Sequence, residues 1–357
     1  MKKTITLADR SSAAAMWALA LVNLLFVLAV AATLMFLAGK SEAADSGPAC
    51  SGVNMLADIK AERPEAYAKI ETDAAATKNG AGLLWKIEKG GLEPSYLFGT
   101  MHMTDPRVVK LTPPAQVAFD AARAVVIETT DVLDQAKLMA SLMTSPELLM
   151  FTDDKTLTSL LSPEDQAIVE KGLADRGIPL ASVTKMKPWM LASMVSLPAC
   201  EMARKANGEP MLDVKLAQQA QAAGKELGGL ETAKSQLEAM ASLPVEFHVE
   251  GLVDTLRLGA KAEDISETMI AIYQAGDTGK FIPFMRAAVP TEKTGDEGYA
   301  AFEEKMITTR NVTMAANAEP YLSKGKAFIA VGALHLPGDE GVIEKLRRAG
   351  YTVTRAD

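Results

Sequence analysis

The chain has 357 residues, of which 48% are hydrophobic and 23% are charged, a composition typical of a globular protein rather than a disordered one. Its 25 glycines, 17 prolines and 2 cysteines exclude collagen-like and disulfide-dense scaffolds. The formal net charge of −8 argues against a nucleic-acid partner, because such a protein needs a basic face to neutralise phosphates.

The N-terminal segment is typical of an export signal. Lys2 and Lys3 precede an almost continuous apolar stretch over residues 13–38, interrupted by Asn23 and Thr33. That length suffices to span a membrane, whereas the small residues that follow suit a signal peptidase. We therefore expect residues 1–44 to be a signal peptide, which is the favoured alternative, or an uncleaved anchor over 13–38. Both place the remaining chain in the periplasm or another extracytoplasmic space, with membrane contact only through this segment.

The cysteine content agrees with export. Cys50 and Cys200 are the two cysteines of the chain, and an even count in an oxidising compartment predicts one disulfide. The alternative is a pair of unrelated thiols.

Residues 45–82 are polar and rich in alanine, and we expect them to form an N-terminal extension with a helix that Pro64 begins. From residue 83 the periodicity changes and a domain is predicted to continue to residue 357. Its first strands are expected over residues 83–88, 96–98 and 124–127, with a helix over 113–122.

Helical patterns fill residues 132–206. Ser145 and Ser162 each stand before a proline, which predicts two helix starts, and Pro188 begins a helix expected to carry Cys200. Further helices are predicted over 213–223, 233–241, 245–258, 263–275, 297–322 and 342–349. Strands are predicted over 327–331 and 351–355, and a short strand or turn over 227–230. This order predicts an α+β fold with a single mixed-sheet core and a long helical insertion at about 132–209.

Two of the three histidines occupy the same local setting. His102 and His335 each stand three residues after a glycine, Gly99 or Gly332, that closes an apolar strand. Ligands bind beyond the carboxyl ends of strands in such sheets, and imidazole is both a common metal ligand and a base near neutral pH. The pairing predicts that both rings converge on one site. The alternative is that each ring caps a strand end or satisfies a core carbonyl.

A third strand ends in a carboxylate, Glu128. A carboxylate beside two imidazoles is the ligand set of a hydrolytic metal site, or a ligand set plus a general base; the alternative is a Glu that becomes exposed where its strand stops. A shared site requires the imidazoles to lie within about 10 Å of each other, since Zn–N bonds are near 2 Å. His248 has no matching partner, and we interpret it as structural.

The residues around both histidine motifs, together with the strand that ends at Glu128, resemble the TraB/GumN family, which is related to the Tiki proteases and the erythromycin-esterase-like proteins. Residues 208–213, residues 229–232 with Gln236, and Arg310-Asn311 add to this resemblance. It covers the chain from about residue 83 to residue 357, so a TraB/GumN-like domain is expected there.

The resemblance implies a metal-dependent hydrolase that cleaves a peptide or another amide or ester bond in a small extracytoplasmic substrate. It implies that His102, His335 and Glu128 ligate a divalent metal (Mn, Co or Zn) or act as bases. Arg310 would hold a carboxylate or stabilise an oxyanion. The implied supporting residues are Gly99, Gly332, Asp213, Glu231 and Asn311.

Two other hypotheses remain open. One is a non-catalytic envelope protein that binds a peptide or saccharide in the same crevice. The other is an anchored structural partner of envelope assembly, which only the N-terminal apolar segment supports.

Overall fold

Within residues 50–289 and 295–357, which the computed structural model describes, six strands form one mixed sheet. They are β1 (Leu84–Glu88), β2 (Ser95–Thr100), β3 (Ala124–Ile127), β4 (Glu226–Gly229), β5 (Ala327–Gly332) and β6 (Thr352–Arg355). Their order across the sheet is β4-β3-β5-β2-β1-β6. The neighbouring strands β4, β3, β5 and β2 run parallel, with β4 at the edge of the sheet, and β1 pairs antiparallel with β2 and β6.

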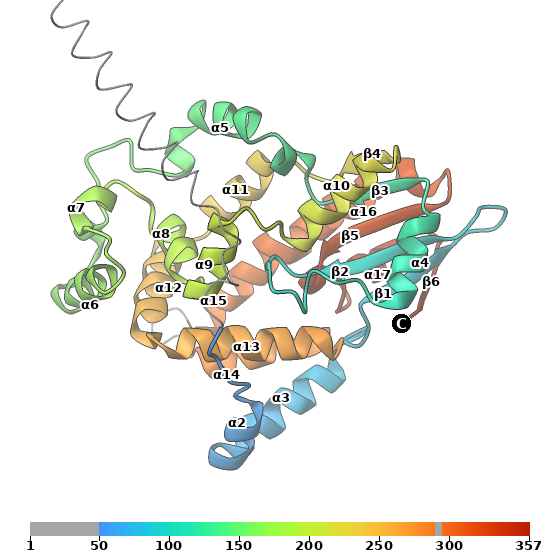
Figure 1. Ribbon diagram of the computed structural model, residues 1–357. Coiled ribbons are helices and arrows are strands. Elements are labelled where there is room, and N and C mark those ends of the chain that lie inside the picture. Colours follow the sequence, from blue (N-terminus) through green and yellow to red (C-terminus); the bar gives the residue numbers. More distant parts are fainter. Residues whose placement is uncertain (1–49, 290–294) are drawn as a thin grey trace, which may run out of the picture. The chain divides into compact units, whose positions relative to one another are not determined.

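Helices cover both faces of this sheet (Figure 1). Along β5, Phe328 and Ala330 belong to one core, whereas Ile329 and Val331 belong to the other, as the two-residue period of a strand requires. The first core includes α4 (Pro113–Ala121), α10 (Leu212–Ala222), α13 (Lys261–Gln274) and α14 (Phe281–Ala288). The second includes α16 (Thr309–Leu322) and α17 (Val342–Arg348). Burial on both faces explains why β3 and β5 are apolar throughout.

A third core lies among helices alone. It joins α6 (Pro163–Ala174), α7 (Leu180–Val183), α8 (Pro188–Val195) and α12 (Val245–Leu258) around Leu173, Leu191 and Leu252. The other helices are α2 (Leu56–Glu62), α3 (Pro64–Ala76), α5 (Gln135–Met143), α9 (Ala199–Ala206), α11 (Ala233–Ala241) and α15 (Gly295–Phe302). Short turns are η1 (Thr130–Leu133), η2 (Pro146–Leu148), η3 (Thr158–Leu160), η4 (Thr278–Lys280), η6 (Ala333–His335) and the π-helical η5 (Glu303–Thr308).

The structure confirms the predicted α+β fold with one mixed sheet, but several helix predictions were wrong. The start at Ser145 yields only the short turn η2 without a side-chain cap, whereas Ser162 caps α6 as predicted. The helix begun by Pro188 ends at Val195, and Cys200 lies on the next helix, α9. Pro198 separates the two because its ring cannot continue a helix.

The predicted disulfide joins Cys50 to Cys200 with a Cα–Cα distance of 5.3 Å. It closes a loop of 150 residues and fastens the start of the described chain to α9. Among the described residues, no helix is both long and apolar enough to cross a membrane. The apolar segment over residues 13–38 lies outside that part of the chain.

Candidate active site

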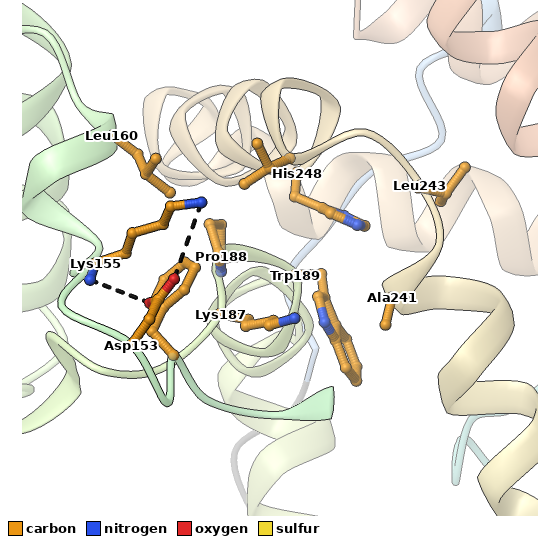
Figure 2. Close-up of a pocket in the computed structure, with 11 residues that line it drawn as sticks. Asp153, Lys155, Leu160, Lys187, Pro188, Trp189, Ala241, Leu243 and His248 are labelled. Carbon is orange, nitrogen blue, oxygen red and sulfur yellow. Dashed lines mark hydrogen bonds and ion pairs between the residues drawn. The ribbon is translucent and has the colours of Figure 1, made fainter. Parts of the chain in front are cut away.

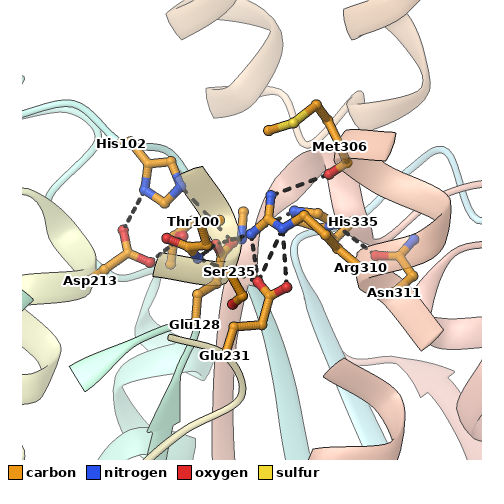
Figure 3. Close-up of polar contacts among 12 residues, drawn as sticks. Thr100, His102, Glu128, Asp213, Glu231, Ser235, Met306, Arg310, Asn311 and His335 are labelled. Atoms are coloured by element: carbon orange, nitrogen blue, oxygen red, sulfur yellow. Dashed lines mark hydrogen bonds and ion pairs between the residues drawn. The ribbon is translucent and has the colours of Figure 1, made fainter. Parts of the chain in front are cut away.

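The site lies where three neighbouring strands end. β5 lies between β2 and β3 and runs parallel to both, with Thr100 opposite Gly332. The carboxyl ends of the three strands therefore meet at one edge of the sheet, and the residues that follow them are His102, Glu128 and His335 (Figure 3).

One carboxylate oxygen is the common point of this group. Glu128 Oε1 lies 3.9 Å from His102 Nε2 and 3.7 Å from His335 Nε2. The same oxygen accepts a hydrogen bond of 2.7 Å from the backbone N–H of Gly332. The two imidazoles thus lie well within the separation that a shared site requires, and the structure brings the three predicted residues together.

His335 is held by a buried amide. Its Nδ1 lies 2.7 Å from Asn311 Oδ1, and Asn311 Nδ2 donates to the Glu340 carbonyl at 2.9 Å. Because the amide presents its oxygen to the ring, His335 Nδ1 carries the proton and Nε2 presents a lone pair when the ring is neutral. Burial lowers the pKa of His335 to about 4, although the negative charge of Glu128 acts to raise it. The ring is therefore neutral at physiological pH.

His102 is held by a carboxylate instead. Its Nδ1 lies 3.1 Å from Asp213 Oδ2, and Thr100 donates to Asp213 Oδ1 at 2.7 Å. The surrounding protein atoms disfavour the charged ring, but the charge of Asp213 and the hydrogen bond to it outweigh them and raise the pKa of His102 to about 9. More than half of this side chain remains open to solvent, at 55% exposure, against 6% for His335.

Arg310 and Gln236 fix the other oxygen of Glu128. Arg310 Nη2 donates to Glu128 Oε2 at 2.8 Å, and Gln236 Nε2 donates to it at 2.9 Å. Arg310 also binds Glu231 through Nε and Nη2, at 3.1 Å and 2.7 Å, and donates from Nη1 to the Met306 carbonyl in the π-helical turn at 3.2 Å.

These contacts decide the charge of Glu128. Burial alone would raise the pKa of its carboxyl group. The charges that both histidines carry at low pH, where His335 is also protonated, together with Arg310 and the Gly332 N–H, outweigh burial and lower that pKa to about 2. Glu128 is therefore an anion and a weak base.

The two glycines of the histidine motifs serve different purposes. A Cβ at Gly332 would lie 3.2 Å from Glu128 Oε1 and 3.6 Å from His102 Nε2, within the space that the three side chains surround. A Cβ at Gly99 would lie 2.7 Å from Leu336 Cδ1, in the packing of β2 against the turn after β5. Gly332 keeps the site open, whereas Gly99 lets two backbone segments approach each other.

Two cavities flank His102. One of about 240 Å³ is lined by Thr100, Arg310 and both histidines together with apolar side chains of Met269, Phe302 and Met306. The other, of about 180 Å³, is lined by His102 and Glu128 with Asp213 and Gln236. A substrate can therefore reach the histidines and the carboxylate from the surface.

The third histidine takes no part in this group. His248 lies on α12 and lines a separate cavity of about 220 Å³ with Trp189, Lys187 and Asp153 (Figure 2). Burial lowers the pKa of His248, as for a structural ring in a core. Among the described residues, His248 Nε2 has no hydrogen-bond partner.

The donor set was tested against the metal that the sequence led us to expect. In residues 50–289 and 295–357, no three His, Cys, Asp or Glu side chains are placed to hold an ion as they stand. The donor chemistry nevertheless fits a divalent metal that displaces the Nε2 proton of His102, because two imidazole nitrogens then face one carboxylate oxygen. The distances of 3.7 and 3.9 Å are longer than the roughly 3.3 Å between two ligands of a tetrahedral ion with bonds of about 2 Å, so the three side chains would have to move slightly closer together to bind it.

Sequence reasoning missed three contributors to the site. The sequence identified Gln236 only as part of the family resemblance, yet its side chain donates a hydrogen bond to Glu128. Thr100 lies inside the first histidine motif and holds Asp213. Tyr273, on α13, donates to the Gly99 carbonyl at 2.9 Å. The position of Thr100 between Gly99 and His102 was a signal that could have been used; the other two depend on distant helices.

Comparison with known proteins identifies relatives of this chain. Metalloprotease TIKI1 of Danio rerio is 26% identical over 313 residues, which cover 76% of this chain and 62% of its own length. Metalloprotease TIKI2 of Danio rerio is 27% identical, with 77% and 61% covered, and Metalloprotease TIKI1 of Homo sapiens is 27% identical, with 76% and 61% covered. The chain thus spans less than two thirds of the length of these relatives.

No solved structure matches the chain significantly. The model of the TraB/PrgY/gumN family matches residues 83–355, which include both histidine motifs, Glu128 and Arg310. That range is most of the chain and confirms the resemblance seen in the sequence. The protein belongs to the TraB/PrgY/gumN family.

Proposed function

We propose that the protein is an exported metal-dependent hydrolase that cleaves a peptide or another amide or ester bond. The observation that carries the proposal is the convergence of His102 and His335 on one oxygen of Glu128 at the ends of three parallel strands. Relatives named metalloproteases support the same class of reaction.

His102 Nε2, His335 Nε2 and Glu128 Oε1 would hold the metal, for which Mn, Co and Zn are the candidates. A divalent metal supplies a polarised substrate carbonyl and a water of lowered pKa. The hydrogen bonds from Asp213 and Asn311 to the Nδ1 atoms orient both rings, as the outer partners of metal-binding histidines do.

The contacts favour one role for each charged residue. A carboxyl group with a pKa of about 2 is a poor proton acceptor, so we assign Glu128 to metal binding rather than to general base catalysis. Arg310 binds Glu128, Glu231 and the Met306 carbonyl. We therefore assign it as a positioning residue that aligns Glu128, which corresponds to the first of the two roles inferred from the sequence, holding a carboxylate, rather than to the oxyanion role.

Two features support export. The Cys50–Cys200 disulfide suits an oxidising compartment, and residues 1–44 have the composition of a signal or anchor. We propose that residues 45–82 extend a hydrolase domain over 83–357, within which the helices at about 132–209 form an insertion.

Histidine variants test this function against a matched control. The full chain, its His102→Ala/His335→Ala variant and its His248→Gln variant would be purified, analysed for bound metal, and assayed on fluorogenic peptides with Mn²⁺, Co²⁺ or Zn²⁺. We expect metal and hydrolysis in wild type and in His248→Gln, and neither in the double variant. Equal behaviour of all three proteins, without metal or cleavage, would instead favour the binding-protein alternative.

A further inference from the structure

A larger apolar cavity adjoins the candidate active site. It measures about 400 Å³ and lies among α12, α13, α14 and α15. Met269, Phe302 and Leu334 line both this cavity and the one that contains the two histidines. Leu334 directly precedes His335 within the second histidine motif, so the wall of the apolar cavity is continuous with the site.

The walls of this cavity offer hydrophobic contact. Its lining includes Phe247, Leu258, Ile265, Ile282 and Met285. Pockets of about 300–1,000 Å³ with such walls bind small molecules or parts of larger ones, and methionine side chains adapt to groups of different shape.

Polar groups in the lining already have partners within the protein. The Thr255 hydroxyl donates to the Gly251 carbonyl at 2.6 Å, and the Tyr299 hydroxyl donates to the Val289 carbonyl at 3.1 Å. Asp254 lies 3.6 Å from Arg257 in an ion pair. A polar occupant would lose its hydration without gaining these partners, which costs free energy, so an apolar occupant is favoured.

We propose that this cavity binds a bulky apolar side chain of the substrate, aromatic or large aliphatic, close to the bond that is cleaved. The proposal rests on the proposed hydrolase function and adds the substrate class. An aromatic side chain buries about 150–250 Å². If the cavity buries about 55–110 Å² more of that area than it buries of alanine, the preference over alanine at the same position is roughly 10- to 100-fold.

Gly251 offers a way to fill the cavity. It lies on α12 in the cavity lining, and a Cβ built there meets no atom within 4 Å. Gly251→Phe therefore adds a ring from the wall without displacing backbone. Ala262→Leu fills the cavity from α13 as a second variant. The matched control is Glu246→Phe, which adds the same ring at an exposed position of α12 outside the lining.

The test uses peptides that differ only by Phe or Ala at one position, scanned along the sequence. For each pair, kcat/KM is measured by hydrolysis and Kd by the fluorescence anisotropy of labelled peptide, after unfolding curves establish that each variant folds. Wild type and Glu246→Phe should prefer Phe at one position by about 10- to 100-fold. Gly251→Phe and Ala262→Leu should bring that ratio close to one.

The outcomes separate the two proposals. Hydrolysis without any Phe preference, or a preference that both filled variants retain, overturns the cavity assignment and leaves the hydrolase intact. If the wild type cleaves no peptide, the hydrolase proposal fails, and the cavity assignment is then judged from the Kd values alone. Tighter binding of the Phe peptide that the filled variants lose then supports the cavity, and equal binding overturns it.

Discussion

Alanine at Gly332 adds one methyl group at the centre of the proposed metal site. The backbone there, with φ −52° and ψ 136°, is open to any residue, so the fold can accommodate the change. The methyl carbon would lie 3.2 Å from Glu128 Oε1, 3.5 Å from His335 Cδ2 and 3.6 Å from His102 Nε2. We expect metal affinity to fall at least about 10-fold, similar to the loss of an outer-shell partner.

Gly99→Ala is the matched control, because it makes the same change in the other histidine motif. Its methyl carbon would lie 2.7 Å from Leu336 Cδ1 and 3.1 Å from Ala333 Cβ, in packing that has no room. Overpacking of this kind costs about 1–3 kcal/mol of unfolding free energy. For Gly332→Ala we expect a change within about 1 kcal/mol, since the entropy gained from losing a glycine partly offsets the crowding.

Urea unfolding of the metal-free proteins and titration with Mn²⁺ or Zn²⁺ measure the two effects separately. Gly332→Ala should lose metal affinity at nearly wild-type stability, whereas Gly99→Ala should lose stability. Wild-type metal affinity in Gly332→Ala, together with destabilisation as large as that of Gly99→Ala, would refute the distinction between the two glycines.

Three further predictions concern other parts of the structure. Asn311→Ala removes the acceptor for His335 Nδ1 and should weaken metal binding about 10- to 100-fold by titration; unchanged affinity would argue against histidine ligation. The double variant Cys50→Ser/Cys200→Ser opens a loop of 150 residues and should cost about 2–5 kcal/mol in urea unfolding, whereas a loss below 1 kcal/mol would mean that the loop is otherwise constrained. The hydrogen bond from Lys78, with those from Asn79 and Arg347, lowers the pKa of Glu344 from 4.5 to about 2. Its contribution to stability is therefore present above pH 4.5 and lost as the pH falls toward 2. Glu344→Gln should flatten the pH dependence of unfolding in that window, and an identical dependence would contradict the assignment.

Local sequence patterns predicted much of the fold. Pro64 and Pro163 stand at the first turns of α3 and α6, where the missing N–H costs nothing. The apolar run over 124–127 predicted β3, since a strand buried on both faces needs no alternation. α14 was missed because its sequence contains Pro283 and has no capping side chain at Lys280.

The helix predicted over 297–322 contains the π-helical turn η5, which periodicity alone does not reveal. A π turn widens the helix by one residue and often lies near a functional site. Here it brings the Met306 carbonyl to the guanidinium of Arg310. That contact joins residues four positions apart and is local, but the π turn itself leaves no mark in the apolar periodicity.

The site residues that directly follow strands could be predicted from the sequence. His102, Glu128 and His335 follow three strands whose ends could be recognised, and parallel neighbours must end at one edge. The connections of Glu128 to Arg310 and Gln236 could not be derived in that way. Arg310 comes from α16, which packs in the second core of the sheet, and Gln236 comes from α11, which packs beside η5.

The most direct test of the central claim is X-ray absorption at the K-edge of the metal bound to the purified full chain. With Zn²⁺ or Mn²⁺ bound at one equivalent, we expect scattering from two imidazole rings and from oxygen ligands, with the imidazole signal lost in the His102→Ala/His335→Ala variant. A metal without histidine ligands, or a spectrum that the double variant leaves unchanged, would contradict it.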